Sequence, residues 1–271
     1  MNKNFKQRKK LGLALGSGGW RGQAHVGVIK ALINAGIKID YIAGASSGAM
    51  VGGAYCALND VNILENIFRE KINTKSLLWA FSDPKLSSGM FKGGKVMEVF
   101  EEFVGKYKIE DLNIPFCAVC SDLLSGEIVE IKEGSLTTAV RASTSVPFVF
   151  EPVKYKNYRL IDGGTAAPVP VSSVKQMGAD IVIAVNLYKN IFPIKAKKLN
   201  ALESVLKTSQ IMLHHLAKYS SQMADLIIEP DIKEDKIYSD PFTRFAKNEG
   251  TIEAGEEAII KNIEVIKKLL S

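Results

Sequence analysis

The stretch Ile42-Ala-Gly-Ala-Ser-Ser-Gly48 predicts the centre of the fold. An apolar run ends within it and a segment rich in small residues follows, so we expect a buried strand, a tight turn and a helix. The pattern G-x-S-x-G between a strand and a helix is typical of a nucleophile elbow, which exposes the hydroxyl group of its serine. That serine is Ser46, and the flanking Gly44 and Gly48 occupy positions where side chains would collide with the neighbouring chain. The alternative is an ordinary glycine-rich turn before a helix.

The size and composition of the chain fit one large α/β domain with a modest appendage. It has 271 residues, of which 46% are hydrophobic. We expect a basic tail over 1–10, a central α/β domain over 11–190 and a mostly helical extension over 191–271, packed on the same domain. No apolar run is long enough to span a membrane, and the first ten residues lack the apolar segment of a secretory signal. A cytoplasmic protein is therefore expected.

The formal net charge of +6 comes partly from a basic cluster near the N-terminus, with a second small cluster at 195–198. Basic residues near an anionic bilayer contribute about 1 kcal/mol each, which favours peripheral contact with the inner face of the membrane. The alternative is a solvated chain end. Nucleic-acid binding is not expected, because the basic residues are not interleaved with aromatic ones. The N-terminal cluster consists of Lys3, Lys6, Arg8, Lys9 and Lys10.

The order of the expected elements predicts parallel strands around the elbow. Strands over 11–15 and 39–43 flank a helix over 23–35, which makes one βαβ unit with parallel, neighbouring strands. The glycine-rich loop Gly16–Gly22 and Ser46 then meet at the carboxyl ends of these strands, where open α/β sheets place their sites. Residues 75–95 are the least regular part. They are either a mobile flap that lines a lipophilic substrate path or touches a membrane, or an ordinary packed connection. Further strands are expected over 114–120, 127–131, 153–155, 158–161, 181–186 and 226–229, and helices over 47–58, 61–72, 95–104, 135–143, 168–177, 199–222 and 251–270.

The loop Gly16-Ser-Gly-Gly-Trp-Arg-Gly22 is a candidate oxyanion hole. Its glycines leave backbone N–H groups uncovered at the start of a helix, where the helix dipole also favours negative charge. Arg21 either adds a positive charge or anchors the loop. A serine nucleophile needs such donors for its tetrahedral intermediate.

The base that would activate Ser46 has several candidates. His25 lies close to the glycine-rich loop and is expected to tie that loop down. His214 and His215 follow Asp162 in the order of a Ser-Asp-His triad, but they fall inside a predicted helix. Asp162 ends an apolar run, and the glycines after it let the chain turn so that the carboxylate projects at a strand end.

Three motifs of this sequence resemble those of the patatin-like phospholipase family, in the family's order. They are the loop Gly16–Gly22, the elbow Gly44–Gly48 and the turn Asp162-Gly163-Gly164. The stretch from Ser121 to Pro147 is also similar, so the resemblance covers about residues 11–187 and is closest to short bacterial members. It departs at two positions: Ser17 replaces a glycine often found in the first motif, and many members have Asp-Gly-Ala where this chain has Asp-Gly-Gly.

The resemblance implies a three-layer α/β/α sandwich with a mostly parallel sheet and a hydrolase of lipid acyl esters. Ser46 would be the nucleophile and Asp162 the general base of a dyad without histidine. The oxyanion hole would come from the amides of Gly18 and Gly19, within a loop that includes Gly16 and Arg21. No cofactor and no metal is expected. Cys117 and Cys120 form a C-x-x-C, but they would point to opposite faces of a strand and cannot grip one metal.

Other functions stay open at this point. The run Gly16-Ser-Gly18 after a strand resembles part of a dinucleotide fingerprint, but the third glycine comes one residue late, at Gly22. The strand before Ser46 also lacks the acidic residue expected at its end. A regulatory or binding protein with the patatin fold and little turnover is the second alternative, because a fold does not decide activity. The oligomeric state, head group and acyl chain do not follow from the sequence.

Overall fold

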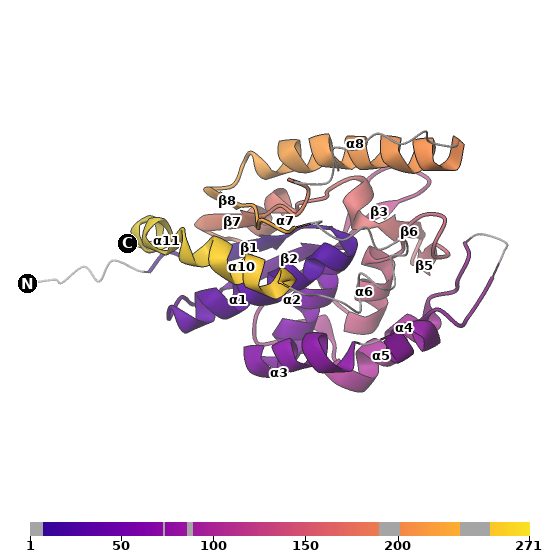
Figure 1. The fold of residues 1–271 in the computed structure, drawn as a ribbon, viewed down its shortest axis with the longest axis horizontal. Helices are drawn as coiled ribbons and strands as arrows, with labels where there is room; N and C mark the ends of the chain where they lie inside the picture. The colour runs from indigo at the N-terminus through magenta and orange to yellow at the C-terminus, as the bar shows by residue number, and fades with distance from the viewer. Residues whose placement is uncertain (1–7, 73, 86–88, 190–200, 234–249) are drawn as a thin grey trace, which may run out of the picture.

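The computed structural model describes residues 8–72, 74–85, 89–189, 201–233 and 250–271, which form a sandwich of three layers (Figure 1). In the described chain, the central sheet has the order β5-β6-β3-β2-β1-β7-β8, and β4 pairs with β3 outside this path. Its strands are β1 (Leu11–Leu15), β2 (Tyr41–Ala45), β3 (Phe116–Asp122), β4 (Ile128–Ile131), β5 (Val153–Tyr155), β6 (Tyr158–Asp162), β7 (Ile181–Val185) and β8 (Leu226–Ile228).

The sheet is parallel at its centre and antiparallel at one side. The pairs β1–β2, β1–β7, β2–β3 and β7–β8 are parallel, whereas β6 pairs antiparallel with β3 and with β5. The βαβ unit expected from the sequence is confirmed by the register Leu13↔Ile42 between β1 and β2. The strand β2 begins and ends two residues later than predicted, so that Ser46 follows it directly.

Helices cover both faces of the sheet (Figure 1). The helices α7 and α8 lie on one face, and α1, α2 and α3 lie on the other. The helix bounds are α1 (Ala24–Asn34), α2 (Ser47–Leu58), α3 (Val61–Asn66), α4 (Thr74–Ala80), α5 (Gly94–Val104), α6 (Leu136–Ser143), α7 (Val171–Gln176), α8 (Ala201–Ser221), α10 (Thr251–Ile260) and α11 (Ile263–Leu270), with short helical turns η1 (Gly19–Gln23), η2 (Ile67–Lys71), η3 (Ile109–Asp111) and η4 (Gly163–Thr165). This arrangement confirms the predicted fold class.

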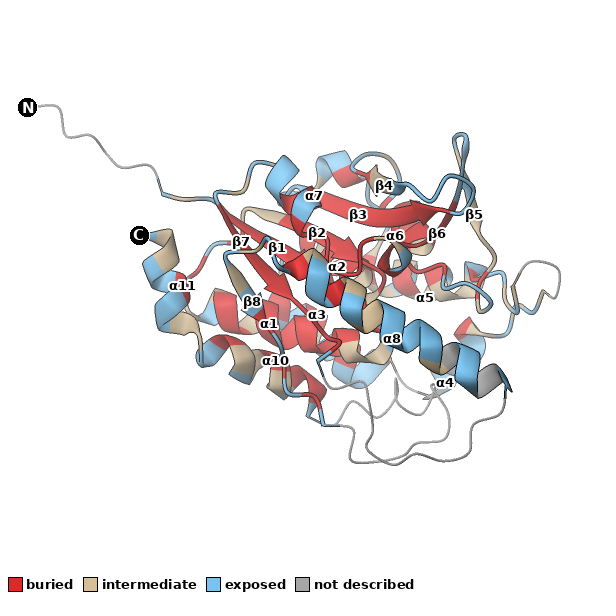
Figure 2. Cartoon of the chain, turned by 90° about the horizontal axis from the view of Figure 1, so that it is seen from above, coloured by how far each residue is buried: buried red, intermediate tan, exposed pale blue. Residues whose placement is uncertain are grey.

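The alternation of side chains along the strands produces two unequal cores. In β1, Leu11, Leu13 and Leu15 face the α1–α2 layer, whereas Ala14 faces α7. The same alternation separates Cys120 from Cys117, which belong to opposite cores as the sequence predicted. Figure 2 shows β1, β3 and β7 buried throughout, while much of α8 is exposed. The larger side chains therefore gather on the face that carries α2, the helix of the elbow.

The C-terminal helices pack on the central domain at α1. A methyl group added to Gly255 of α10 would lie 1.9 Å from the carbonyl oxygen of Ala24, and one added to Gly27 would lie 1.9 Å from that of Ile252. The two helix backbones therefore touch. The single helix expected over 251–270 is instead two helices, because α10 ends at Ile260 and α11 begins at Ile263. We infer from this packing that the C-terminal extension belongs to the same domain.

Two further expectations are modified by the structure. Part of the irregular segment 75–95 is helical, because α4 spans Thr74–Ala80. Of the N-terminal basic cluster, Lys3 and Lys6 lie outside the described residues, as does the cluster at 195–198. Arg8 donates to the carboxylate of Asp40 at 2.9 Å and Lys9 donates to the Leu269 carbonyl at 2.8 Å. No helix of the described residues is both long and apolar enough for a membrane span.

Candidate active site

Ser46 occupies the strained turn that the sequence predicted. It lies between β2 and α2 with φ of 54° and ψ of −119°, in a region that residues with a side chain rarely adopt. A methyl group on Gly48 would lie 2.1 Å from the Leu15 carbonyl oxygen, and one on Gly44 would lie 2.4 Å from the amide nitrogen of Ala49. The two glycines are therefore required by close approach of the backbone. In this conformation the Ser46 hydroxyl reaches Asp162 at the end of β6.

The carboxylate of Asp162 accepts a hydrogen bond from the hydroxyl group of Ser46. Asp162 ends β6, whose pairing with β3 places it opposite Cys120. The Ser46 hydroxyl donates to Asp162 Oδ2 at 2.6 Å, and the amide of Gly164 donates to Oδ1 at 2.7 Å. A methyl group on Gly163 would lie 1.9 Å from the Val119 carbonyl oxygen, so the turn after Asp162 also needs its glycine. The sheet thus brings together two residues that are 116 positions apart in the sequence.

Burial gives this carboxylate an unusual proton affinity. Asp162 is 6% exposed, and loss of solvation raises its pKa from 3.8 to about 6, against the opposing hydrogen bonds from Ser46 and Gly164. A carboxylate with a pKa near 6 is a better proton acceptor than an ordinary aspartate. The pair therefore has the geometry and the basicity for proton transfer from the serine hydroxyl.

The glycine-rich loop offers fewer donors than expected. The amide of Gly16 donates to the Val185 carbonyl at 3.1 Å, and the amide of Ser17 donates to that of Pro168 at 2.7 Å. The prediction that Gly16 contributes to an oxyanion hole is therefore wrong for its amide, which continues the pairing of β1 with β7 inside the sheet. Within the described chain, the amides of Gly18 and Gly19 donate no backbone hydrogen bond to another segment. Gly19 has φ of +58° and lines the cavity at Ser46.

The side chains beside the loop hold it in place. The guanidinium group of Arg21 lies 5.0 Å from the ring centre of Trp20, and Gly19 of the loop and Gln23 just after it line the cavity. His25 donates from Nε2 to the Gly16 carbonyl at 2.7 Å, as expected for a residue that ties the loop down. Burial lowers the pKa of His25 to about 4, so its imidazole is neutral near pH 7.

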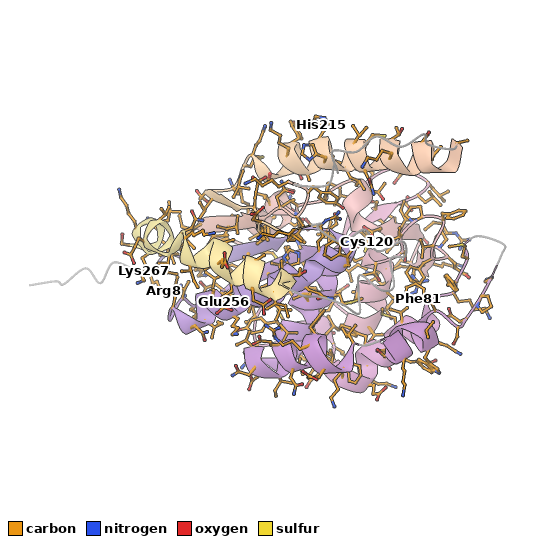
Figure 3. The ribbon with its side chains drawn as sticks, in the orientation of Figure 1. Arg8, Phe81, Cys120, His215, Glu256 and Lys267 are labelled. Carbon is orange, nitrogen blue, oxygen red and sulfur yellow. The ribbon has the colours of Figure 1, made fainter. Side chains whose placement is uncertain are left out.

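The two C-terminal histidines do not come between Ser46 and Asp162. His214 donates from Nδ1 to the Tyr188 carbonyl at 2.7 Å. His215 is exposed on the outer side of α8 (Figure 3). The hydroxyl group of Ser46 contacts the Asp162 carboxylate directly, without an imidazole between them. This geometry favours a two-residue arrangement over a triad.

A cavity of about 350 Å³ opens beside Ser46. Its walls, mostly aromatic and aliphatic, come from η1, α2, η2, α4, the described part of the segment between α4 and α5, α5, and the segment after α6. The ring centres of Phe81 and Phe91 lie 5.3 Å apart, and those of Phe81 and Phe150 lie 5.4 Å apart. The irregular segment 75–95 therefore lines an apolar path, one of the two interpretations of its sequence. Lining residues include Met50, Ala54, Phe68, Phe100, Val146 and Phe150.

Two supporting residues were not recognised in the sequence. The amide of Ser46 donates to Ser143 Oγ at 2.9 Å, and Ser143 in turn donates to the Val119 carbonyl at 2.6 Å. Arg141 donates to Ser145 Oγ at 2.6 Å and to the Glu151 carbonyl at 3.1 Å, which fixes the cavity wall. Both lie in the stretch that resembles the family, but a serine and an arginine on a helix carry no signal of these contacts. In the part of the chain described, no three His, Cys, Asp or Glu side chains gather as metal ligands do.

Replacement of Asp162 by Asn is predicted to stabilise the protein at high pH. The pKa of Asp162 is higher in the folded state than in the unfolded state. The parent protein therefore has its full stability below pH 3.8, where the carboxyl is protonated in both states, and its free energy of unfolding falls as the pH rises through about 6. The loss is roughly 3 kcal/mol for the buried group. Urea unfolding at about pH 8 should give Asp162→Asn a higher free energy of unfolding than the parent, with little gain near pH 4.

Asp122→Asn is the matched control for that measurement. Hydrogen bonds from the amide of Arg159 and from Ser125 hold the pKa of Asp122 below its ordinary range, so this variant should lose stability at pH 8. An Asp162→Asn protein that is less stable than its parent at pH 8 would contradict the inferred burial cost.

The two departures from the family motifs occupy the same space. A methyl group on Gly164 would lie 2.7 Å from Ser17 Oγ and 2.9 Å from Ser17 Cβ. Rotation of Ser17 does not relieve this contact, because its hydroxyl is hydrogen-bonded to the Tyr188 hydroxyl at 2.9 Å. We therefore expect Gly164→Ala to lower the free energy of unfolding by about 1–3 kcal/mol, the usual cost of overpacking.

Ser17→Gly should rescue that variant. The double variant is predicted to unfold at a higher urea concentration than Gly164→Ala alone, although it lacks the Ser17–Tyr188 hydrogen bond. Ser17→Gly by itself serves as the reference for the loss of that bond, which is worth about 1 kcal/mol. The explanation fails if Gly164→Ala has the same free energy of unfolding as the parent. It also fails if the double variant is no more stable than Gly164→Ala, because Ser17 and the added methyl group then do not compete for the same space.

Comparisons with known proteins find several relatives of this chain. An uncharacterized NTE family protein of Mycobacterium tuberculosis is 40% identical over 179 residues, which cover 66% of this chain and 49% of that protein. A second one from the same organism is 30% identical over 274 residues, covering 92% of this chain and 46% of the relative. This chain thus spans about half the length of these relatives.

A third relative is the Neurospora crassa protein named lysophospholipase nte1. It is 32% identical over 182 residues, which cover 66% of this chain and 12% of that protein. Among solved structures, VipD from Legionella pneumophila aligns with a TM-score of 0.49 and 14% identity, covering 94% of this chain and 67% of that one. Residues 13–175, more than half of the chain, match the family of patatin-like phospholipases. The chain therefore belongs to the patatin-like phospholipase family.

Proposed function

We propose that this chain is a serine acyl hydrolase that cleaves acyl esters of lipids, as a phospholipase A, a lysophospholipase or an esterase. The observation that carries the proposal is the 2.6 Å hydrogen bond from the Ser46 hydroxyl to the buried carboxylate of Asp162. It lies at the polar end of an otherwise apolar cavity. Family membership supports the same reaction class, and one relative is named a lysophospholipase.

The first half of the reaction forms an acyl-enzyme. Ser46 Oγ attacks the ester carbonyl carbon while its proton passes to Asp162 Oδ2. The amides of Gly18 and Gly19 donate to the oxyanion of the tetrahedral intermediate, and the helix dipole of η1 and α1 adds to their effect. The intermediate then collapses, and the departing alcohol takes the proton from Asp162. The acyl chain lies in the apolar cavity throughout.

The second half releases the fatty acid. A water molecule attacks the ester of Ser46 and gives a proton to Asp162, which again acts as the base. Breakdown of the second tetrahedral intermediate returns that proton to Ser46 Oγ. Asp162 must be ionised at the start of both halves, so the rate should fall as the pH drops through about 6. The proposed reaction uses no metal and no organic cofactor.

The main rival is a patatin-fold protein that binds ligands with little turnover. The strain at Ser46 argues against it, because a positive φ at a residue with a side chain costs about 1–3 kcal/mol and persists at sites that use it. Binding alone has no need of a buried ionisable carboxylate beside that hydroxyl.

We further propose that the protein works in the cytoplasm, at the surface of a membrane that supplies its substrate.

Hydrolysis of lysophosphatidylcholine and of p-nitrophenyl butyrate tests the proposal. We expect Ser46→Ala to lower kcat/KM for both substrates by at least about 10³-fold, as expected when a nucleophile is removed. The matched control is Ser209→Ala on the exposed face of α8, which should keep parental rates. His214→Ala tests the triad, and it too should remain active. Full activity of Ser46→Ala, or abolition by His214→Ala, would refute the proposed dyad.

A further inference from the structure

Large apolar side chains are exposed around the mouth of the cavity. Leu78 and Trp79 lie on α4, and Met90, Val146 and Phe148 lie on the two segments that follow Phe81 and α6. Leu78 and Phe148 are each 64% exposed, and Trp79 is 43% exposed. We call these five residues the apolar rim. Exposed apolar side chains gathered in one place mark an interaction site, whereas scattered ones do not.

The apolar rim is continuous with the cavity wall. The amide of Met90 donates to the Phe148 carbonyl at 3.0 Å, and the amide of Phe91 donates to that of Val149 at 2.9 Å. Met90 and Val146 themselves line the cavity, as does Ala80 beside Trp79. A lipid chain could therefore pass from the rim to the interior without crossing a polar barrier.

Phe148 is held in its exposed position by the backbone. Its φ of 72° lies in the left-handed region, where a bulky residue is a true outlier. Such a conformation costs about 1–3 kcal/mol and persists only where the surroundings fix it. The hydrogen bonds from Met90 and Phe91 fix it here, while Arg141 donates to the Glu151 carbonyl on the same segment. The strained backbone of Phe148 therefore lowers the stability of the fold at a residue whose ring is exposed to solvent.

The charges beside the rim fit a phospholipid surface. The side chains of Lys75 and Lys92 are exposed, and the Lys95 ammonium lies 5.2 Å from the ring centre of Trp79. Two carboxylates of the same region are engaged within the protein. Asp83 accepts from the amide of Gly94 at 2.8 Å, and Glu151 pairs with Lys85 at 2.8 Å. Tryptophan and lysine together are typical of side chains at the level of lipid head groups.

We propose that the apolar rim docks into the surface of a phospholipid bilayer and passes an acyl chain from it to Ser46. This inference rests on the proposed function for its substrate, but docking itself requires no catalysis. It places the membrane contact at the rim, part of which lies in the segment 75–95 that the sequence offered as a candidate membrane contact, and not at the N-terminal basic cluster. The described members of that cluster already have partners, because Arg8 is paired with Asp40, Lys9 donates to the Leu269 carbonyl and Lys10 donates to the Tyr41 hydroxyl.

Vesicle sedimentation tests the docking surface. The probe is sucrose-loaded vesicles of phosphatidylcholine with one-quarter phosphatidylglycerol, and Ser46→Ala protein is used so that no lipid is hydrolysed. We expect this protein to bind, and the added pair Leu78→Glu and Phe148→Glu to weaken binding at least about tenfold. The matched control is Met212→Glu, which alters a residue that is 67% exposed on α8, on the opposite face of the sheet (Figure 1).

Tryptophan fluorescence gives a readout without any change in the rim. The chain has two tryptophans, so Trp20→Phe leaves Trp79 as the sole one. Its emission should shift to the blue on addition of vesicles and be quenched when the lipids carry brominated acyl chains. Failure to bind, unchanged binding after the rim substitutions, equal loss in Met212→Glu, or a Trp79 signal that ignores the vesicles would overturn the proposal. If the parent protein binds vesicles but does not hydrolyse esters, the proposed function is refuted and the docking proposal stands.

Discussion

The site depends on one costly contact, the burial of the Asp162 carboxylate against the hydroxyl group of Ser46. Removal of this carboxylate from water opposes folding whenever the group is ionised, and the same burial raises its pKa to about 6. The pairing of β3 with both β2 and β6 holds the two residues together despite this cost. Ser46, just after β2, and Asp162, at the end of β6, are thereby fixed at hydrogen-bond distance.

The elbow and the cavity follow from the same arrangement. Close contact of the elbow glycines with the backbone of β1 and α2 holds Ser46 at its positive φ. Because α2 starts there, its next turns carry Met50 and Ala54 along the cavity wall. Ser46 lines the cavity, whereas the Asp162 carboxylate is buried behind it and is reached through the Ser46 hydroxyl. The elbow therefore joins the apolar cavity to the buried carboxylate.

Much of this could be predicted from the sequence, because its strongest signals are local. Glycine spacing located the turns at Ser46 and Asp162, and apolar runs located most of the strands of the sheet. The engagement of the Gly16 amide could not be foreseen, since its partner, the Val185 carbonyl, belongs to a strand about 170 positions away. The helix α4 was missed because turn residues surround it, so that no helical period stands out over its seven residues.

The pH dependence of covalent labelling at Ser46 tests the account most directly. A fluorophosphonate reacts with an activated serine, and peptide mapping identifies the residue that carries it. We predict that the label lies on Ser46, that the labelling rate rises with pH around a midpoint near 6, and that Asp162→Asn abolishes this rise together with most of the rate. A label on another residue, or a rate that is unaffected by Asp162→Asn, would contradict the account.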